Sequence, residues 1–195
     1  MPRAGLSTAV VVAAAADLAD GGGLDRLTLA SVAQALGVKL PSLYKHVAGL
    51  EDLRRGIAVV ALRELGTALA AAAVGRAGPD ALRALARAYR AYALARPGRY
   101  AASVRAPEPG DPEHEEAAET VARTVYAALA GYGLEGGAAI DGARILRSGL
   151  HGFVSLELAH GFGLPQDVDR SFERLLDALD AGLRSTAGGE PGRPS

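Results

Sequence analysis

The chain has 195 residues, and almost half of them are apolar although aromatic residues are scarce and tryptophan is absent. A core built mainly from alanine and leucine favours close-packed helices over a β-sandwich, so the composition predicts an all-α protein of one or two domains. The lack of cysteine excludes disulfides, thiolate metal sites and cysteine nucleophiles. The net charge of −1 excludes a surface that is basic throughout, but it permits a local basic patch.

The first predicted helix runs from a cap at Ser7 to about Ala19, ahead of three consecutive glycines. Its apolar stretch, residues 9 to 16, could pass for the core of a signal peptide. Asp17 and Asp20 follow immediately, however, and the apolar spacing is helical, so we expect an amphipathic first helix. No other stretch approaches the roughly 20 apolar residues of a membrane span. We therefore expect a cytoplasmic protein that does not contact a membrane.

Two short helices joined by a tight turn are predicted next. Thr28 can cap a helix over residues 29 to 36, and Gly37 ends it because glycine adopts a left-handed conformation at little cost. Pro41 suits the first turn of a third, short helix. Two helices at such a glycine-bearing corner form a helix-turn-helix, whose second helix can lie in the major groove of DNA.

The third helix is expected to have an inward and an outward face. At 100° per residue, Leu40, Leu43 and Val47 share one arc, which we expect to face the core. The opposite arc is about 140° wide and is small, hydroxylic and cationic. It carries Pro41, Ser42, Lys45 and His46, with Tyr44 at its edge.

The segment from residue 26 to residue 50 contains three lysine or arginine residues and no carboxylate. Its cations can reach phosphates or a guanine edge, and its hydroxyl and imidazole groups can hydrogen-bond bases or phosphates. The free N–H groups at the start of the second helix offer a further phosphate site. The residues expected at the DNA are Thr28, Lys39, Leu40, Pro41, Ser42, Tyr44, Lys45 and His46.

The remainder of the chain is also predicted to be helical. Cap, proline and apolar-spacing signals place further helices at about 53–74, 78–95, 112–130, 138–160 and 166–184. A proline-containing break at 96–98 and an exposed loop at 106–113 separate two of them. The Gly/Pro-rich tail, 187–195, is expected to be disordered.

The stretch LTLASVAQALGVKLPSLYKHVAGLEDL, residues 27 to 53, resembles the DNA-binding segment of the TetR/AcrR family of bacterial transcriptional regulators. The resemblance is carried by Thr28, Val32-Ala33, Gly37-Val38, Leu43-Tyr44, His46 and Glu51-Asp52-Leu53. It implies a three-helix DNA-binding domain at 1–52, a helical ligand-binding and dimerisation domain at 53–186, and about nine helices in all. It also implies a homodimer that represses transcription from a palindromic operator until a small molecule releases it.

Two positions depart from that family's pattern. Many relatives have a phosphate-contacting lysine immediately before the Glu-Asp pair, where this chain has Leu50. Position 40, often polar in relatives, is leucine, which could touch a thymine methyl or turn inward. These departures keep open an alternative in another class, a small-molecule-binding helical module without productive DNA binding.

The second half resembles the C-terminal domain of a TetR subset named for a Trp-His-Gly motif, over residues 82–100 and 147–164. Leu150 takes the place of the tryptophan, directly before His151. The helix around them is apolar nearly all round, which predicts burial by its own domain and by a partner. Arg147 and His151 share one side of it, so they either recognise a polar or anionic ligand or line a dimer seam. The expected ligand-binding residues are Tyr89, Tyr92, Arg147, His151 and Phe153.

Metal binding and catalysis receive little support from the sequence. Glu157 and His160 have the i, i+3 spacing of di-iron helix bundles, but such a site needs a second motif and two further glutamates. The acids of residues 113–116 start a helix, where the helix dipole explains them. No nucleophile motif and no glycine-rich phosphate loop is present. We expect no metal, no cofactor and no enzyme activity, with a metal-dependent bundle enzyme as the weakest alternative.

Overall fold

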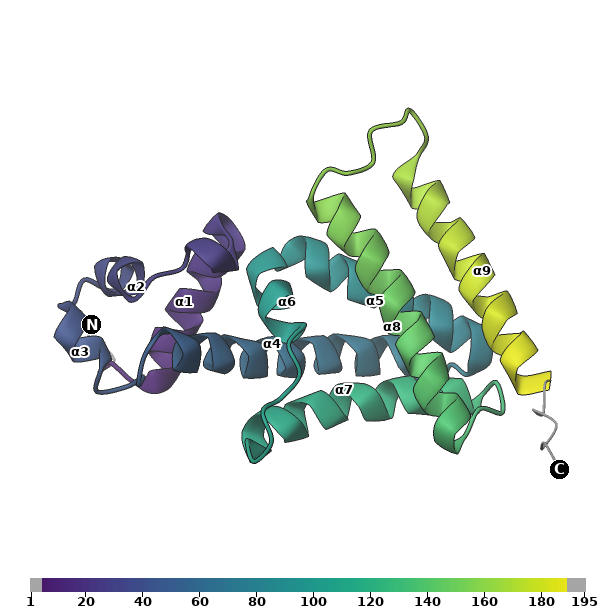
Figure 1. Ribbon diagram of the computed structural model, residues 1–195, viewed down its shortest axis with the longest axis horizontal. Helices are drawn as coiled ribbons and strands as arrows, with labels where there is room; N and C mark the ends of the chain where they lie inside the picture. Colours follow the sequence, from purple (N-terminus) through teal and green to yellow (C-terminus); the bar gives the residue numbers. More distant parts are fainter. Residues whose placement is uncertain (1–4, 189–195) are drawn as a thin grey trace, which may run out of the picture. The chain divides into compact units, whose positions relative to one another are not determined.

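The computed structural model describes residues 5–188, and over that range it contains helices, turns and loops but no strand (Figure 1). The helices are α1 (Thr8–Gly22), α2 (Leu29–Leu36), α3 (Leu40–Leu43), α4 (Leu50–Ala73), α5 (Gly78–Ala95), α6 (Pro97–Ser103), α7 (Pro112–Ala130), α8 (Gly136–Leu158) and α9 (Val168–Gly188), with a short 3₁₀ helix η1 (Leu24–Arg26) after α1. The prediction of an all-α fold with about nine helices is confirmed for the described residues.

The chain forms two compact units. Unit 1 comprises the residues up to 64 together with 95–118, and it therefore holds α1, η1, α2, α3, most of α4, α6 and the start of α7. Unit 2 comprises 65–94 and the residues from 119 onward, which supply the end of α4, α5, most of α7, α8 and α9. The units differ from the predicted domain ranges because 95–118 pack with the N-terminal helices. The functional division at residue 52 stays a prediction, since packing alone does not report function.

The predicted caps of the first two helices are confirmed. The Ser7 side chain accepts a hydrogen bond from the amide of Val10, and the helix continues to Gly22, three residues beyond the predicted end. In α2 the Thr28 hydroxyl accepts from the amide of Ser31 at 3.1 Å, while the Ser31 hydroxyl accepts from the amide of Thr28 at 3.2 Å. This reciprocal capping box fixes the first turn of α2.

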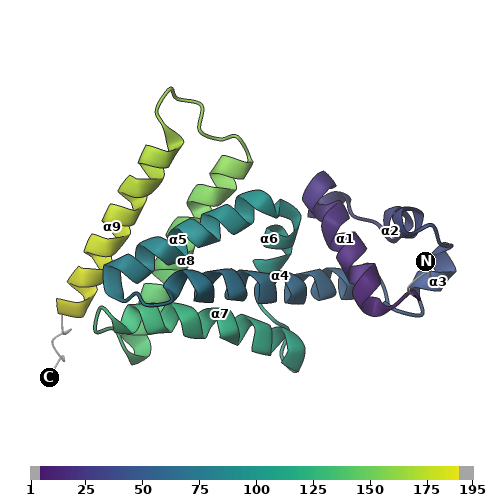
Figure 2. The same cartoon turned by 180° about the vertical axis from the view of Figure 1, so that it is seen from behind.

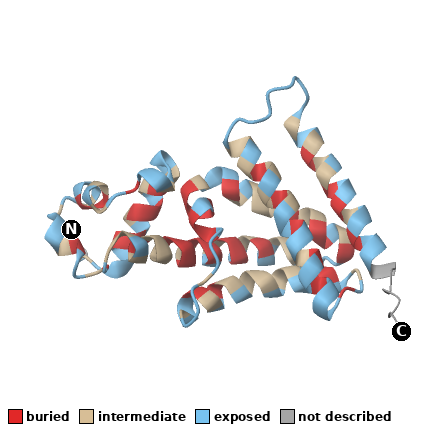
Figure 3. Ribbon diagram, viewed as in Figure 1, coloured by how far each residue is buried: buried red, intermediate tan, exposed pale blue. Residues whose placement is uncertain are grey.

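Unit 1 has a core of small and branched apolar side chains. Val11, Ala15, Val32, Leu43, Leu53 and Ile57 are fully buried in it, contributed by α1, α2, α3 and α4. Alanine and valine side chains are small enough for the four helices to approach closely. The helices therefore share this core cluster without an aromatic residue. Figure 3 shows buried residues on several helices of the unit, whereas the α2–α3 corner is largely exposed.

Helix α6 was not predicted. The sequence around Arg96 and Pro97 indicated only a break, but Pro97 occupies the first turn of a new helix, where its missing N–H leaves no bond unmade. The helix packs against α1 through Gly98 and Arg99. Local sequence signals missed it because this packing involves partners about 80 residues away in the chain.

In unit 2, α8 and α9 lie side by side and run in opposite directions, as both views show (Figures 1 and 2). Leu146 and Leu150 of α8 and Phe172, Leu176 and Leu183 of α9 are buried in a shared core, to which α5 adds Leu82 and Ala86. Helix α9 extends to Gly188 and so includes the first two residues of the tail that was predicted to be disordered. The remainder of that predicted tail lies outside the described residues.

Helix α4 corrects the expectation about membrane spans. By length and composition alone its 24 residues could cross a membrane, although 44% of the apolar window is buried inside the protein. Leu53, Ile57 and Leu65 take that burial against other helices, as in the core helix of a globular protein.

Candidate DNA-binding surface

The α2–α3 corner has the geometry of a helix-turn-helix. Gly37 adopts a left-handed conformation with φ 65°, and the amide of Val38 donates back to the carbonyl of Ala33 at 3.0 Å. Helix α3 is only four residues long, shorter than predicted. The amides of His46 and Val47 nevertheless both donate to the carbonyl of Leu43, at 2.8 and 3.0 Å, so the helical turn continues through this segment.

Most of the candidate DNA-contacting side chains are exposed. Thr28, Lys39, Leu40, Pro41, Tyr44 and Lys45 are exposed, and Ser42 and His46 are half-buried. The exposed fraction of Tyr44 is 56% although tyrosine is large and mostly apolar. All eight predicted residues thus belong to unit 1 and none of them is fully buried, while their contact with DNA stays a prediction.

Leu40 corrects the predicted inward arc of the third helix. Leu43 and Val47 are buried as expected, but Leu40 is 38% exposed. It occupies the first position of α3, directly after the N-cap residue Lys39. Of the two alternatives for this residue, the outward one holds in the structure.

Contacts with α1 and α4 hold the corner in place. The Thr8 hydroxyl of α1 donates to the carbonyl of His46 at 3.1 Å. At the following turn, the Asp52 carboxylate accepts from the amide of Ala48 at 2.9 Å. These two bonds hold the backbone on either side of Val47. They therefore fix the segment that carries Tyr44, Lys45 and His46.

The charge pattern favours an anionic partner. Neither Lys39 nor Lys45 forms an ion pair with any residue between 5 and 188, and both are exposed. The flanking carboxylate of Glu51 is instead engaged by Arg54 at 2.9 Å and by Arg105 at 3.2 Å. The two lysines are therefore available for phosphates, whose neutralisation supplies much of the affinity of proteins for DNA.

The predicted ligand-binding residues of unit 2 do not all meet. Tyr89 packs against two core clusters, one of which it shares with Phe153 and the other with Tyr92. His151 is half-buried, with its Nδ1 3.4 Å from the hydroxyl of Ser155, and it does not belong to either cluster. Arg147 is exposed in this chain, and its predicted burial by a partner stays a prediction. The spacing places Arg147 about 120° around α8 from Phe153, which separates it from the aromatic side.

A half-buried ion pair in unit 2 was missed. The Arg90 guanidinium donates twice to the Glu157 carboxylate, at 2.5 and 2.7 Å, and it also pairs with Asp169 at 2.7 Å. It stacks 4.8 Å from the centre of the Phe172 ring. The hydrogen bonds to Glu157 raise the pKa of Arg90 above its usual value. Nothing in the sequence around Arg90 indicates its partner, because that carboxylate lies 67 residues away in the chain.

The pairing of Glu157 also bears on the di-iron alternative. Its carboxylate is committed to Arg90, and His160 is exposed at the end of α8 with φ 54°. Within residues 5–188 no group of three histidine, aspartate or glutamate side chains is placed to hold a metal ion. Glu157 thus belongs to an ion pair with Arg90, and His160 lies just beyond the end of α8.

Comparison with known proteins identifies the class. Residues 82–179 match the family model described as the tetracyclin repressor-like C-terminal domain. An uncharacterised HTH-type transcriptional regulator of Mycobacterium tuberculosis is 42% identical over 189 residues, which cover 94% of this chain and 85% of the relative. A second such regulator, from Bacillus subtilis, is 32% identical, covering 93% and 95%. The chain belongs to the TetR family of transcriptional regulators, and the Trp-His-Gly subset stays a prediction.

Solved structures agree with this assignment. A possible TetR family transcriptional regulator of Streptomyces coelicolor superposes with a TM-score of 0.71 at 26% identity, covering 92% of this chain and 99% of the other. A TetR of Acinetobacter baumannii, in complex with minocycline, has a TM-score of 0.73 at 24% identity, covering 95% and 100%. The likeness to the Acinetobacter protein shows that the two chains share a fold.

Proposed function

We propose that this regulator is a cytoplasmic homodimer that represses transcription by binding a near-palindromic operator and is released by a small-molecule effector. DNA binding is assigned to residues 1–52, and effector binding and dimerisation to 53–186. The protein acts by binding and not by catalysis. The observation that carries the proposal is the outward face of the α2–α3 corner, with its exposed Tyr44 and its two unpaired lysines.

The DNA contacts follow from the chemistry of that face. Lys39 and Lys45 suit phosphates or a guanine edge, and the Tyr44 hydroxyl suits a phosphate oxygen. Ser42 and His46 are set back toward the core, so they would contact bases only when the corner enters the major groove. Leu40 is exposed beside them and suits a thymine methyl.

Support for an effector comes from the similar fold that binds minocycline in the Acinetobacter protein. In this chain Tyr89, Tyr92 and Phe153 lie half-buried against the apolar cores of unit 2, and they are our candidates for the ligand walls. Arg147 and His151 are candidates for a polar end of the ligand or for the dimer seam.

The DNA-binding proposal is tested by an electrophoretic or fluorescence titration with a fragment of the protein's own promoter. Tyr44→Ala should weaken binding by about tenfold or more, since a large exposed contact is removed. Lys45→Ala should weaken binding and reduce the slope of log affinity against log salt by about 1. Arg123→Ala, which removes an exposed cation from α7, is the matched control and should bind like the wild type. Wild-type affinity in both test variants would contradict the proposal.

A second candidate function is a helical small-molecule sensor that does not bind DNA productively. It is favoured by the leucines at positions 40 and 50, which remove two polar groups from the DNA side. A salt-dependent shift of the promoter fragment by the wild type would exclude it.

A further inference from the structure

Arg26 is an exposed cation at the end of η1, two residues before the Thr28 cap of α2. Its guanidinium forms no ion pair and no hydrogen bond with any residue between 5 and 188. It belongs to the stretch from residue 26 to residue 50 that contains no carboxylate, yet it was not among the residues expected at the DNA. An unpaired cation at this place requires its own explanation.

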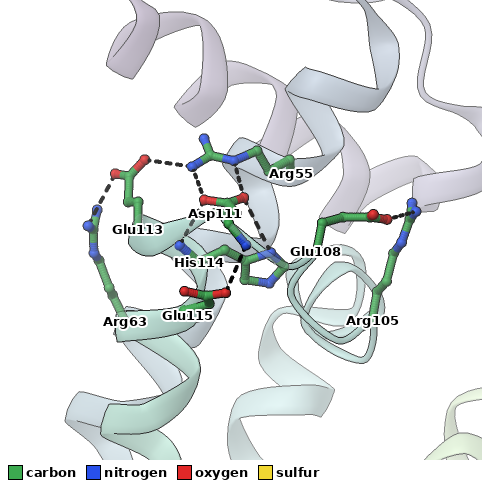
Figure 4. A network of polar contacts seen from close by, with 9 residues as sticks. Arg55, Arg63, Arg105, Glu108, Asp111, Glu113, His114 and Glu115 are labelled. Atoms are coloured by element: carbon green, nitrogen blue, oxygen red, sulfur yellow. Dashed lines mark hydrogen bonds and ion pairs between the residues drawn. The ribbon is translucent and has the colours of Figure 1, made fainter.

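The other described arginines of unit 1 are paired with carboxylates of the same unit. Arg55 donates twice to Asp111 at 2.5 Å and once to Glu113 at 3.1 Å (Figure 4). Arg105 pairs with Glu108 at 2.7 Å in the same view. Ion pairs also engage the rest of this set, which is Arg54, Arg63, Arg96 and Arg99.

Arg26 is therefore the one arginine in the described part of unit 1 that has no carboxylate partner. The two lysines of the chain, Lys39 and Lys45, share this property, and all three cations fall in the acid-free stretch. Arginines outside this stretch stabilise the unit from within. The unpaired cations instead gather next to the α2–α3 corner, where an anionic partner is expected.

The local backbone determines the direction of the Arg26 side chain. Leu27, the next residue, is extended with φ −66° and ψ 130°, and it is buried in the core of unit 1 with 3% exposed. Successive side chains of an extended segment point to opposite sides. Since Leu27 points into the core, Arg26 and Thr28 both point away from it.

Asp25, the neighbour on the other side, does not neutralise Arg26. The two charges form no ion pair, and Asp25 lines an open pocket beside α4, α6 and the start of α7 that Arg26 does not border. Leu24 packs against the core of unit 1, so η1 is held in place at its first residue. The guanidinium of Arg26 is thus presented apart from the carboxylate that precedes it.

We propose that Arg26 binds a phosphate of the operator beside the phosphate that Thr28 contacts. In a helix-turn-helix the first helix crosses the DNA backbone while the second lies in the major groove. Helix α2 is that first helix, and Arg26 and Thr28 stand at its start. The inference rests on the proposed function, to which it adds a contact on the backbone that flanks the groove.

The chemistry of the guanidinium fits this partner. Its planar fork donates two parallel hydrogen bonds to phosphate oxygens, which an ammonium cannot do. A phosphate contact fixes the register of the protein on the duplex but reads no base. Arg26 is therefore a positioning residue that adds affinity for operator and for unrelated DNA alike.

The test is a fluorescence titration of the full chain with its promoter fragment and with an unrelated duplex of equal length, over a range of salt concentrations. Arg26→Ala should weaken both complexes by the same factor, about three- to tenfold, and reduce the slope of log affinity against log salt by about 1. Arg26→Lys keeps the charge and should keep the slope, with an affinity between those of the alanine variant and the wild type. Arg170→Ala removes an exposed arginine of α9 that is also unpaired within residues 5–188, and this control should bind like the wild type.

A second measurement locates the contact on the DNA. Promoter duplexes are prepared in which one phosphate at a time is replaced by an uncharged methylphosphonate. One replacement should weaken the wild type and Lys45→Ala but leave the affinity of Arg26→Ala unchanged, because that variant has already lost the contact. The urea midpoint of Arg26→Ala should equal that of the wild type, since the guanidinium bonds no described residue.

The outcomes separate this inference from the proposed function. If Lys45→Ala binds weakly while Arg26→Ala keeps the wild-type affinity and salt slope, the contact at Arg26 is refuted and DNA binding by the α2–α3 corner stands. A loss confined to the promoter sequence, or a lowered urea midpoint, would also refute it, because Arg26 would then read bases or hold the fold. A wild type that shows no salt-dependent binding to either duplex would overturn both proposals.

Discussion

Asp111, immediately before α7, shows how much one side chain can do at a helix start. Its carboxylate accepts from the amide of His114 at 3.2 Å, which caps the helix, and it receives two bonds from the Arg55 guanidinium. The hydrogen bonds from Arg55 lower the pKa of Asp111 to about 2. A carboxyl group of this kind makes folding depend on pH.

The direction of that dependence follows from the lowered pKa. The folded protein keeps Asp111 ionised while the unfolded chain protonates it near pH 4, so its contribution is complete above about pH 4 and lost as the pH falls toward 2. Asp111→Asn should lower the melting temperature at neutral pH and should show a smaller further drop over that acid window than the wild type. Thermal unfolding followed by circular dichroism across the pH range measures this. Asp141→Asn serves as the control, and an Asp111→Asn curve parallel to the wild type would contradict the assignment.

The sequence predicted part of this arrangement. The helix start next to Asp111 was predicted from cap and proline signals, because such signals depend on neighbours in the chain. Its partner Arg55 lies 56 residues earlier in the chain, so no local signal indicated the ion pair. Exposure of Tyr44 and Lys45 followed from helical spacing, whereas the exposure of Leu40 did not, since the first residue of a short helix need not follow the spacing of the rest.

At the scale of elements, the packing of α6 on α1 is the feature that the sequence concealed. Gly98 of α6 approaches the backbone of Ala19 and Asp20 so closely that an added Cβ would overlap it. The next residue, Arg99, is buried and bonds the carboxylates of Asp20 and Asp17, the latter at 2.8 Å. Two acids at the negative end of α1 are unfavourable on their own, and Arg99 explains their presence.

Because of this contact, adding a single methyl group at position 98 should lower the stability of the folded protein. Gly98→Ala should destabilise the protein by about 3 kcal/mol or more, because backbone atoms of α1 cannot move aside as a flexible side chain would. Gly22→Ala, in the last turn of α1 with open space around the added atom, is the matched control. It should change stability by less than about 1 kcal/mol. The midpoints of urea unfolding of the two variants measure this difference. Similar midpoints would show that Gly98 of α6 is not in close contact with α1.

At the scale of the whole molecule, each of the two units is built from two segments that are separated in the sequence. Helix spacing predicted most helix positions to within a few residues, since periodicity and caps are local. The inclusion of 95–118 in unit 1 was not predictable in this way, because it depends on Gly98, Arg99 and Asp111 meeting α1 and α4. Family membership, by contrast, was carried by a continuous stretch, residues 27–53, and the comparisons confirm it.

The proposed dimer makes a prediction about the DNA itself. Two α2–α3 corners bound to successive major grooves require half-sites about one turn, or about 34–36 Å, apart. Inserting half a turn, about five base pairs, at the centre of the operator moves one half-site to the opposite face of the duplex. Affinity should then fall to the level of non-specific DNA, while a change of central bases at constant length should leave it within a few fold. A fluorescence titration with the two modified operators, and sedimentation to confirm two chains per duplex, tests this. Undiminished binding to the lengthened operator would mean that each corner acts alone.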